Sequence, residues 1–266
     1  MSASLRPEDV TDGLRTRRIG RWVECLVETE STNDAAFAAA ARGAPEGLCI
    51  VADAQRRGRG RLGRAWHSPP GGLWCSVLLR PTLPPEDRPF LTVLGALGCC
   101  RAIEAVTPLR PRIRWPNDVL VAGRKVAGIL VEVRDGPGGA VGALGIGCNV
   151  ASVPADLPPD VAAATTCLDA EAGAAIPRAA LLRALCEALD ALYDALGGGE
   201  RDALDCEWRE RSAVLGARVR VTVPDAACEG RLTAIGATAG VTLVLPDGAI
   251  RRFKSEHITR LELLCE

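Results

Sequence analysis

The stretch RIRWPNDVLVAGRKVAGILVEV, residues 112–133, holds two apolar runs separated by a short polar segment. Valine, isoleucine and leucine fill both runs and favour strands, whereas the intervening Gly123, Arg124 and Lys125 are typical of a chain reversal. The stretch therefore predicts a strand–turn–strand unit. Because helical patterns occur on both sides of it along the chain, it favours an α+β fold with a mixed sheet and helices.

Further strands and helices are expected on either side of this unit. Apolar runs predict strands at residues 21–30, 48–54, 73–80 and 140–150. Alanine- and leucine-rich segments predict helices at 31–43, 90–106, 177–196 and 200–212. The segment 90–106 is apolar on all sides, so its helix is expected at the centre of the core.

The character of the chain changes near Gly216. Five short alternating runs, separated by Pro-Asp, Gly and Asp-Gly turns, predict a small β-barrel at this end of the sequence. No long linker separates the parts, so they are expected to pack closely. The expected organisation is a polar N-terminal leader at 1–20, a main domain at 21–212 and a C-terminal barrel at 213–266.

The overall composition narrows the class of protein. The 266-residue chain is 48% hydrophobic and carries 32 Lys and Arg against 33 Asp and Glu, a net charge of −1. Because nucleic-acid-binding proteins are usually basic, this balance argues against a DNA- or RNA-binding protein. The first twenty residues lack the apolar core of a signal peptide, and no uncharged apolar run reaches the length of a membrane span. A cytoplasmic protein is expected.

The cysteines and histidines predict no metal centre. Eleven cysteines are scattered without a CxxC pair, so they are expected to be reduced residues of the core. His67 has no carboxylate, Ser or Cys partner near it in the sequence, which argues against a catalytic triad or metal role.

The stretch QRRGRGRLGR, residues 55–64, concentrates five arginines and three glycines between two expected strands. Glycines let the backbone turn sharply and approach a ligand, and guanidinium forks match carboxylate and phosphate oxygens. No GK[ST] follows, and a strand rather than a helix comes next, so the stretch is neither a P-loop nor a dinucleotide fingerprint. From its charge alone, it could equally be a solvated loop.

Three other short motifs stand out from the apolar background. Trp115-Pro-Asn-Asp118 predicts an extended turn held by side-chain hydrogen bonds, and taken singly it is an ordinary strand corner. Gly145-Ile-Gly-Cys-Asn149 leaves space beside a strand and offers an amide that could contact a purine edge. Ser31-Thr32-Asn33 can cap a helix, where free N–H groups also suit an anion.

Taken together, the motifs resemble those of biotin–protein ligases. They are E-S-T-N-D at 30–34, Gln55 with G-R-G-R-L-G-R at 58–64, W-P-N-D at 115–118, K-V-A-G-I-L-V-E at 125–132 and G-I-G-x-N at 145–149. The resemblance covers nearly all of the chain from Glu30 onward. It implies a class II synthetase-like mixed sheet with flanking helices, followed by a small SH3-like β-barrel. It also implies a monofunctional ligase, since the expected leader is too short for a DNA-binding domain.

The resemblance implies an ATP-dependent ligase. Such an enzyme activates biotin as biotinyl-5′-adenylate and transfers it to a lysine of a biotin carboxyl carrier protein, part of acetyl-CoA carboxylase or a related carboxylase. Biotin and ATP are then the substrates, and Mg²⁺ is carried by ATP, with no protein metal site. Neither DNA nor a membrane is an expected partner, and a homodimer is compatible with the resemblance.

The same resemblance implies roles for individual residues. Biotin contacts are implied for Ser31, Thr32, Asn33, Gln55, Arg59, Gly60, Arg61, Arg114 and Gly128. Nucleotide contacts are implied for Arg61, Arg64, Trp66, Asn117, Lys125 and Asn149. Arg59, Arg61 and Arg114 are expected to be the catalytic side chains, because the carboxylate and the phosphate that must be joined are both anions.

One position departs from the family pattern. The family usually has K-W-P-N-D, whereas this chain has Arg114 before the tryptophan. An arginine supplies the same positive charge but is larger and more rigid, and it stays protonated at neutral pH. Activity with altered kinetics is therefore expected.

Two alternative functions follow from the same features. A lipoate or octanoate ligase or transferase shares the fold, but those families typically lack the G-R-G-R-x-G-R loop. A nucleic-acid-binding module would use the arginines on phosphates, but no aromatic residues are interleaved with them.

Overall fold

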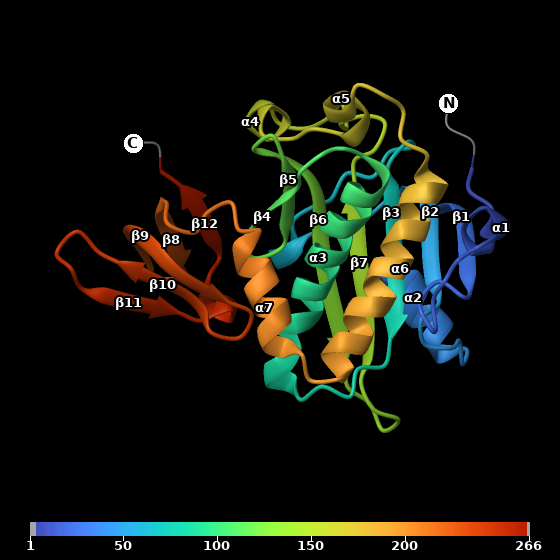
Figure 1. Ribbon diagram of the computed structural model, residues 1–266, viewed down its shortest axis with the longest axis horizontal. Helices are drawn as coiled ribbons and strands as arrows, with labels where there is room; N and C mark the ends of the chain where they lie inside the picture. The colour runs from blue at the N-terminus through green and yellow to red at the C-terminus, as the bar shows by residue number, and fades with distance from the viewer. Residues whose placement is uncertain (1–3, 265–266) are drawn as a thin grey trace.

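The computed structural model describes residues 4–264, and residues 1–3 and 265–266, at the ends of the expected leader and barrel, lie outside it. A seven-stranded mixed sheet flanked by helices forms the larger part, and a five-stranded antiparallel sheet lies at one side of it (Figure 1). The predicted α+β fold is confirmed, and the second sheet fits the small barrel-like domain expected at this end of the chain.

The large sheet has the strand order β1-β2-β3-β7-β6-β5-β4. Its strands are β1 (Val23–Thr29), β2 (Cys49–Gln55), β3 (Leu73–Leu79), β4 (Arg112–Arg114), β5 (Asp118–Val121), β6 (Arg124–Arg134) and β7 (Val141–Cys148). β1 and β2 are parallel, and every other neighbouring pair is antiparallel. The predicted strand–turn–strand unit is present as β5 and β6. The turn at Trp115–Asn117 separates the short β4 from β5, which agrees with the corner predicted from Trp115-Pro-Asn-Asp118.

Helices cover both faces of this sheet unequally. They are α1 (Pro7–Thr11), α2 (Thr32–Ala41), α3 (Pro89–Val106), α4 (Pro159–Ala163), α5 (Leu168–Ala172), α6 (Arg178–Gly197) and α7 (Arg201–Glu210). α3 packs on β5, β6 and β7 and is covered in turn by α6, whereas α2 packs on β2, β3 and β7 from the other side (Figure 1). Strand alternation serves both faces: Val51 belongs to the α3-side core, and Ile50 belongs to the α2-side core.

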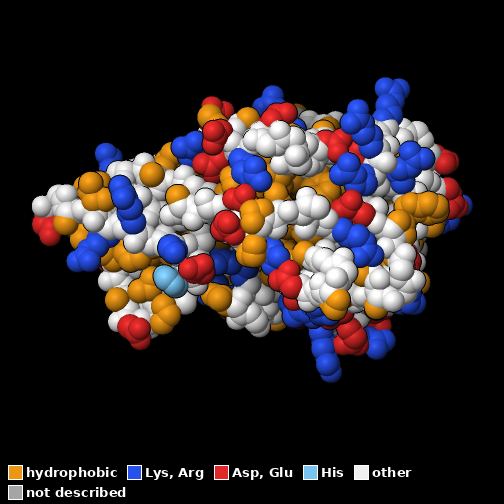
Figure 2. All heavy atoms as spheres, turned by 90° about the horizontal axis from the view of Figure 1, so that it is seen from below, with side chains coloured by type: hydrophobic (Ala, Val, Ile, Leu, Met, Phe, Trp, Pro, Cys, Tyr) orange, Lys and Arg blue, Asp and Glu red, His pale blue; other side chains and the backbone are white. Residues whose placement is uncertain are grey.

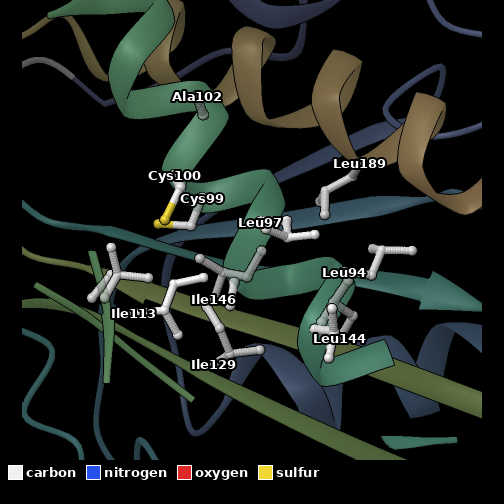
Figure 3. Close-up of a cluster of buried hydrophobic side chains, with 14 of the residues drawn as sticks. Leu94, Leu97, Cys99, Cys100, Ala102, Ile113, Ile129, Leu144, Ile146 and Leu189 are labelled. Atoms are coloured by element: carbon white, nitrogen blue, oxygen red, sulfur yellow. The ribbon is translucent and has the colours of Figure 1, made fainter. Parts of the chain in front are cut away.

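The larger core lies between α3, α6 and the sheet. Leu94 and Leu97 of α3 belong to the same core as Ile129 and Leu144 of the sheet (Figure 3), and a Cβ at Gly95 would lie 2.7 Å from Ile129 and 2.8 Å from Leu144. A side chain at Gly98 would lie 2.5 Å from Leu189 of α6, so glycine permits the close approach of the two helices. α3 is also the one helix of the described residues that is long and apolar enough to cross a membrane. Of its most apolar stretch of 18 residues, 67% is buried inside the protein, which agrees with the central position expected from its sequence.

The N-terminal segment packs against α6. Val10 and Ile19 are fully buried. The Asp190 carboxylate accepts hydrogen bonds from the backbone N–H groups of Arg17, Arg18 and Ile19 at 2.7, 3.0 and 2.8 Å. The segment expected to be a polar leader therefore contributes to the core of the large domain, and the boundary at residue 20 stays a prediction.

The second sheet has the order β11-β10-β9-β8-β12. Its strands are β8 (Arg218–Val223), β9 (Ala226–Gly236), β10 (Gly240–Val244), β11 (Ile250–Phe253) and β12 (Arg260–Leu263). All five correspond to the short runs read from the sequence. The N–H of Ala237 donates to Asp205 of α7 at 2.9 Å, and the N–H of Ala213 donates to Ile113 of β4 at 2.8 Å. These bonds tie the small sheet to the large domain.

Ten cysteines lie within the described residues, and all ten are free thiols. Seven of them are buried, which agrees with the expected core role, whereas Cys206 is exposed on α7. The eleventh, Cys265, lies outside the described residues.

Candidate functional site

The candidate site is a cavity on the α2 side of the large sheet. α2 packs mainly on β2, β3 and β7 and reaches β6 through the Asn33 side chain, so the face over β5 and the first half of β6 stays open. The arginine–glycine loop, residues 56–68, and the segment 154–165 form walls of a cavity of about 770 Å³, a volume in the range of small-molecule sites. The cavity is therefore large enough for an organic substrate together with a nucleotide.

Every residue singled out from the sequence as a site residue lines this one cavity. They are Ser31, Thr32, Asn33, Gln55, Arg59, Gly60, Arg61, Arg64, Trp66, Arg114, Asn117, Lys125, Gly128 and Asn149. They come from the start of α2, the loop after β2, the β4–β5 corner and the floor strands β6 and β7. The structure brings these residues together, and what each would contact in a ligand stays a prediction.

A hydrogen-bonded polar cluster forms one end of the cavity. Gln55 at the end of β2 accepts from the backbone N–H of Thr32 at 2.8 Å, and its own amide donates to Ser68 at 2.8 Å. Ser76 of β3 lies 2.6 Å from the Asn33 amide oxygen and 2.7 Å from the Thr32 hydroxyl. Because these groups fix one another, the cluster is a preorganised polar pocket.

Glycines on neighbouring strands form the floor of the cavity. Gly128 of β6 and Gly147 of β7 are register partners, and the indole of Trp66 covers both. An added Cβ at Gly147 would lie 2.3 Å from Trp66 Nε1, so only glycine leaves room for the ring. The Lys125 ammonium lies 4.9 Å from the centre of this ring, and Trp74 meets the ring edge to face at 6.3 Å. The G-I-G motif thus leaves the space on β7 that the Trp66 ring occupies.

The five arginines of the loop have different surroundings. Arg56 and Arg57 form exposed ion pairs with Glu28 and Glu30. Arg59 is held by two carboxylates, described below. Arg61 and Arg64 have no ion pair among the described residues, and both line the cavity. The motif resemblance implied ligand contacts for Arg59, Arg61 and Arg64 only, and the structure places these three in the cavity lining, with Arg56 and Arg57 outside it.

Burial lowers the pKa of the Arg61 guanidinium; Asp118 raises this pKa and Arg64 lowers it further. A partly desolvated cation without a carboxylate in contact favours an incoming anion, because the anion replaces the lost solvation. Leu62, next in the chain, has φ of 58° and a 60% exposed side chain, so the loop turns sharply at its tip.

Two cations share one carboxylate at the β4–β5 corner. Asp118 contacts Arg114 Nη2 at 2.8 Å and Lys125 Nζ at 2.5 Å. Burial raises the pKa of Asp118, but the charges and hydrogen bonds of Lys125 and Arg114 outweigh it, so the pKa lies below its usual value. The trio carries one net positive charge into the cavity wall. The Arg114 guanidinium is therefore fixed in place without being fully neutralised.

The two asparagines of the motifs bond to the protein backbone. Asn117 donates from its side chain to the carbonyl of Ile129 at 2.8 Å. Asn149 is 2% exposed and donates from its side chain to the carbonyl of Thr166 at 3.1 Å. Both amides therefore fix the walls of the cavity, whether or not they also contact a nucleotide.

His67 finds a carboxylate partner that the sequence does not reveal. Its Nδ1 lies 2.8 Å from Asp156, which is 89 residues away in the chain. Within the described residues, no group of three or more His, Cys, Asp and Glu side chains could hold a metal ion.

The structure adds residues to the site that sequence reasoning missed. Asp34 and Glu132 bind a loop arginine, and Asp118 binds two cations. The segment Ile258–Leu263, which includes β12, also lines the cavity, so the small sheet contributes to the site. Asp34, Asp118 and Glu132 lie inside the motifs given above, and this position within a motif was the one feature of the sequence that could have marked them as site residues.

Comparisons with known proteins agree with this geometry. A family model described as the biotin/lipoate A/B protein ligase family matches residues 26–150. The bifunctional ligase/repressor BirA of Bacillus subtilis is 31% identical over 258 residues, covering 96% of this chain and 78% of the relative. The biotin–[acetyl-CoA-carboxylase] ligase of Mycobacterium tuberculosis is 34% identical over 232 residues, covering 83% and 84%.

Solved structures show the same fold. A biotin protein ligase from Aquifex aeolicus in complex with biotin and ATP superimposes with a TM-score of 0.76 at 24% identity, covering 92% of this chain and all of the other. This likeness supports the fold, and the sequence relatives support the family. On the combined matches of sequence, motif order and fold, the chain belongs to the biotin–protein ligases of the biotin/lipoate protein ligase family.

Proposed function

We propose that this protein activates biotin with ATP as biotinyl-5′-adenylate and transfers the biotinyl group to a lysine of a biotin carboxyl carrier protein. The observation that carries the proposal is one cavity that joins a preorganised polar pocket to two unpaired loop arginines, Arg61 and Arg64. A polar ring system suits the pocket, and anions suit the arginines. The names of the relatives agree with this chemistry.

In the first step, a carboxylate oxygen of biotin attacks the α-phosphorus of ATP, and pyrophosphate leaves. Two anions must approach each other, so nearby cations lower the barrier. Arg61 faces the cavity without a carboxylate in contact, and Arg114 adds charge from the opposite wall. We assign both to the reacting carboxylate and phosphate, with biotin held by Ser31, Thr32, Asn33 and Gln55.

The nucleotide is assigned to the part of the cavity beside Trp66. Its indole offers an aromatic face for adenine, and Lys125 and Arg64 lie near enough to line the same space. The described residues provide no cluster of carboxylates for a metal. A Mg²⁺ ion would therefore be held by the phosphates of ATP and by water, where it neutralises their charge.

In the second step, the neutral amine of the carrier lysine attacks the biotinyl carbonyl, AMP leaves, and the amine loses a proton. The mixed anhydride reacts readily with water, so a loop that orders over it protects the intermediate. No side chain of the protein is assigned as a nucleophile, and no covalent enzyme intermediate is part of the proposal.

The wider setting follows the same assignment. The partner is a biotin carboxyl carrier protein, and we place the reaction in the cytoplasm. β1 is an edge strand of the large sheet, with the Val27 side chain 76% exposed, so pairing of two copies is part of the proposal. On the face drawn in Figure 2, blue and red side chains are interspersed without a broad basic patch, which favours a small-molecule ligase over a nucleic-acid-binding module.

Incubation with biotin, Mg²⁺ and ATP tests the proposal. Biotinyl-adenylate is expected by mass spectrometry, and biotin-dependent exchange of pyrophosphate into ATP is expected alongside it. Loop residues 56–64 are expected to resist trypsin when both substrates are present. Formation of the adenylate of lipoate or octanoate, with none from biotin, would instead favour the alternative ligase activity.

A further inference from the structure

The Arg59 guanidinium lies between α2 and β6 and contacts a carboxylate on each. Its two Nη atoms form a parallel fork with the Asp34 carboxylate at 2.6 and 2.8 Å. Nη2 also lies 3.0 Å from Oε2 of Glu132. Paired forks of this kind are among the strongest polar contacts in proteins and fix direction as well as distance. One loop side chain thus joins a helix, a strand and the loop.

This cluster continues into the polar pocket. The Asn33 amide donates to Oε2 of Glu132 at 2.6 Å and accepts from Ser76 at 2.6 Å. Through Thr32 and Gln55, the same network reaches Ser68, which lies at the far end of the loop. Both ends of the loop are therefore bonded to the floor of the cavity by one connected set of side chains.

The positive charge of Arg59 is neutralised by the two carboxylates of this cluster. Two carboxylates surround one guanidinium, so the cluster of Arg59, Asp34 and Glu132 carries no net positive charge that could attract an incoming anion. The hydrogen bonds that Arg59 donates to Asp34 lead the effects that raise the pKa of Arg59, whereas burial lowers the pKa of Arg61. The two arginines are two residues apart and have opposite surroundings. Of Arg59 and Arg61, only Arg61 lines the cavity without a carboxylate in contact and can bind a substrate anion.

We infer that Arg59 is a positioning residue, and that Asp34 and Glu132 form a carboxylate clamp that holds the loop so that Arg61 faces the reacting anions. The substrate part of this inference rests on the proposed function, whereas the clamp itself is a property of the free protein. The assignment replaces the direct catalytic part expected for Arg59 from the motif.

Three changes probe the clamp. The double variant Asp34→Asn with Glu132→Gln keeps the size of both side chains and removes their charge. Arg59→Met removes the guanidinium, and Arg59→Lys keeps a positive charge but cannot form the fork. The matched control is Glu28→Gln with Arg56→Met, because this exposed ion pair joins the same loop to β1 but lies outside the cavity lining.

Hydrogen–deuterium exchange of the backbone amides at 57–67, in the free protein, reports loop opening directly. Each clamp variant, Arg59→Lys included, is expected to raise the exchange rate about tenfold, since charge-assisted hydrogen bonds are lost. Adding Asp34→Asn to Arg59→Met is expected to change nothing further, because these two residues act through one contact. The control variant is expected to stay within twofold of the natural protein, about the limit of additivity errors.

Kinetics of adenylate formation separate positioning from direct action. The double carboxylate variant and Arg59→Met are expected to raise the KM for biotin by the same factor, about tenfold, with a smaller change in kcat. Thermal unfolding of every variant checks that the fold is retained, and the single variants Asp34→Asn and Glu132→Gln replace the double one if it unfolds.

Two results would overturn the inference. One is the loss of adenylate formation in Arg59→Met while the double carboxylate variant keeps natural exchange and kinetics, because Arg59 would then act on the substrate itself. The other is full protection of the loop in all clamp variants. If the exchange pattern is as expected but the natural protein makes no biotinyl-adenylate, the clamp stands and the proposed function fails.

Discussion

Replacing Gly147 by alanine tests the assignment of the nucleotide to the space beside Trp66. Gly147 lies in β7 under the indole, and an added Cβ would meet Nε1 at 2.3 Å and Cε2 at 2.6 Å. Strand backbone accepts alanine, so the change acts through this contact alone. The indole ring of Trp66 must therefore move away from β7.

The size of the effect follows from the distances. Ordinary contact begins near 3.4 Å, so the ring must move by about 1 Å. Overpacking of a closed core costs about 1–3 kcal/mol, but Trp66 borders a cavity and can move into it, so about 1 kcal/mol is expected. That corresponds to a fall in Tm of about 2–4 °C. A 1 Å displacement of a substrate-positioning group can lower kcat/KM for ATP by about 10- to 100-fold.

Two other glycines of the same strand provide matched comparisons. A Cβ at Gly145 would lie 2.5 Å from Oδ1 of Asn33, so Gly145→Ala is expected to weaken biotin binding instead. A Cβ at Gly142 would come no closer than 3.7 Å to its nearest neighbours, so Gly142→Ala is expected to leave the binding of both substrates unaffected. The three variants separate the two halves of the cavity within one strand.

Pyrophosphate exchange at varied ATP and at varied biotin measures both effects, and thermal unfolding measures stability. The reasoning predicts a raised KM for ATP in Gly147→Ala and a raised KM for biotin in Gly145→Ala. Natural kinetics for Gly147→Ala, accompanied by the expected fall in Tm, would show that Trp66 moves without consequence and has no part in nucleotide binding.

Three further predictions concern charge. Arg114→Lys is expected to keep adenylate formation within about tenfold of the natural rate, since the positive charge remains. If the natural protein, with Arg114, forms no adenylate at all, the expectation that arginine supports activity at this position is refuted. Asp190→Ala leaves three backbone N–H groups without an acceptor and is expected to lower the free energy of unfolding by about 2–4 kcal/mol in urea titrations; an unchanged midpoint would contradict this. Because the pKa of Asp118 is lowered in the folded protein, its ionisation stabilises the fold above about pH 4, and this stability is lost as the pH falls through the lowered value. The difference in Tm between the natural protein and Asp118→Asn should therefore shrink below about pH 4, whereas a constant difference would argue against the ion pairs.

The regular elements were predictable because their signals are local. The helix α6 and alternating strands such as β8 carry their period in the sequence, whereas α3 was recognisable from its length and its apolar composition on all sides. α4 and α5 are five residues each, too short to show a helical period, and neither was predicted. The corner between β4 and β5 was predictable as well, because Trp115-Pro-Asn-Asp118 is a local turn signal.

The site was predictable as a set of motifs but not as a set of contacts. The polar residues of α2 and the loop stand out against an apolar background, and the residues singled out for the site all line one cavity. The contact of Arg59 with Glu132 joins residues 73 apart, and that of His67 with Asp156 joins residues 89 apart. Pairings at such distances are decided by the tertiary fold, so sequence reasoning could not show that Arg59 is paired with two carboxylates while Arg61 and Arg64 have no ion pair among the described residues.

The most direct test of the central claim is mass spectrometry of a purified biotin carboxyl carrier domain after incubation with this protein, biotin, Mg²⁺ and ATP. The account predicts a mass gain of one biotinyl group on a single lysine, dependent on ATP and accompanied by release of AMP. An unmodified carrier domain, under conditions in which a known biotin–protein ligase modifies it fully, would contradict the account.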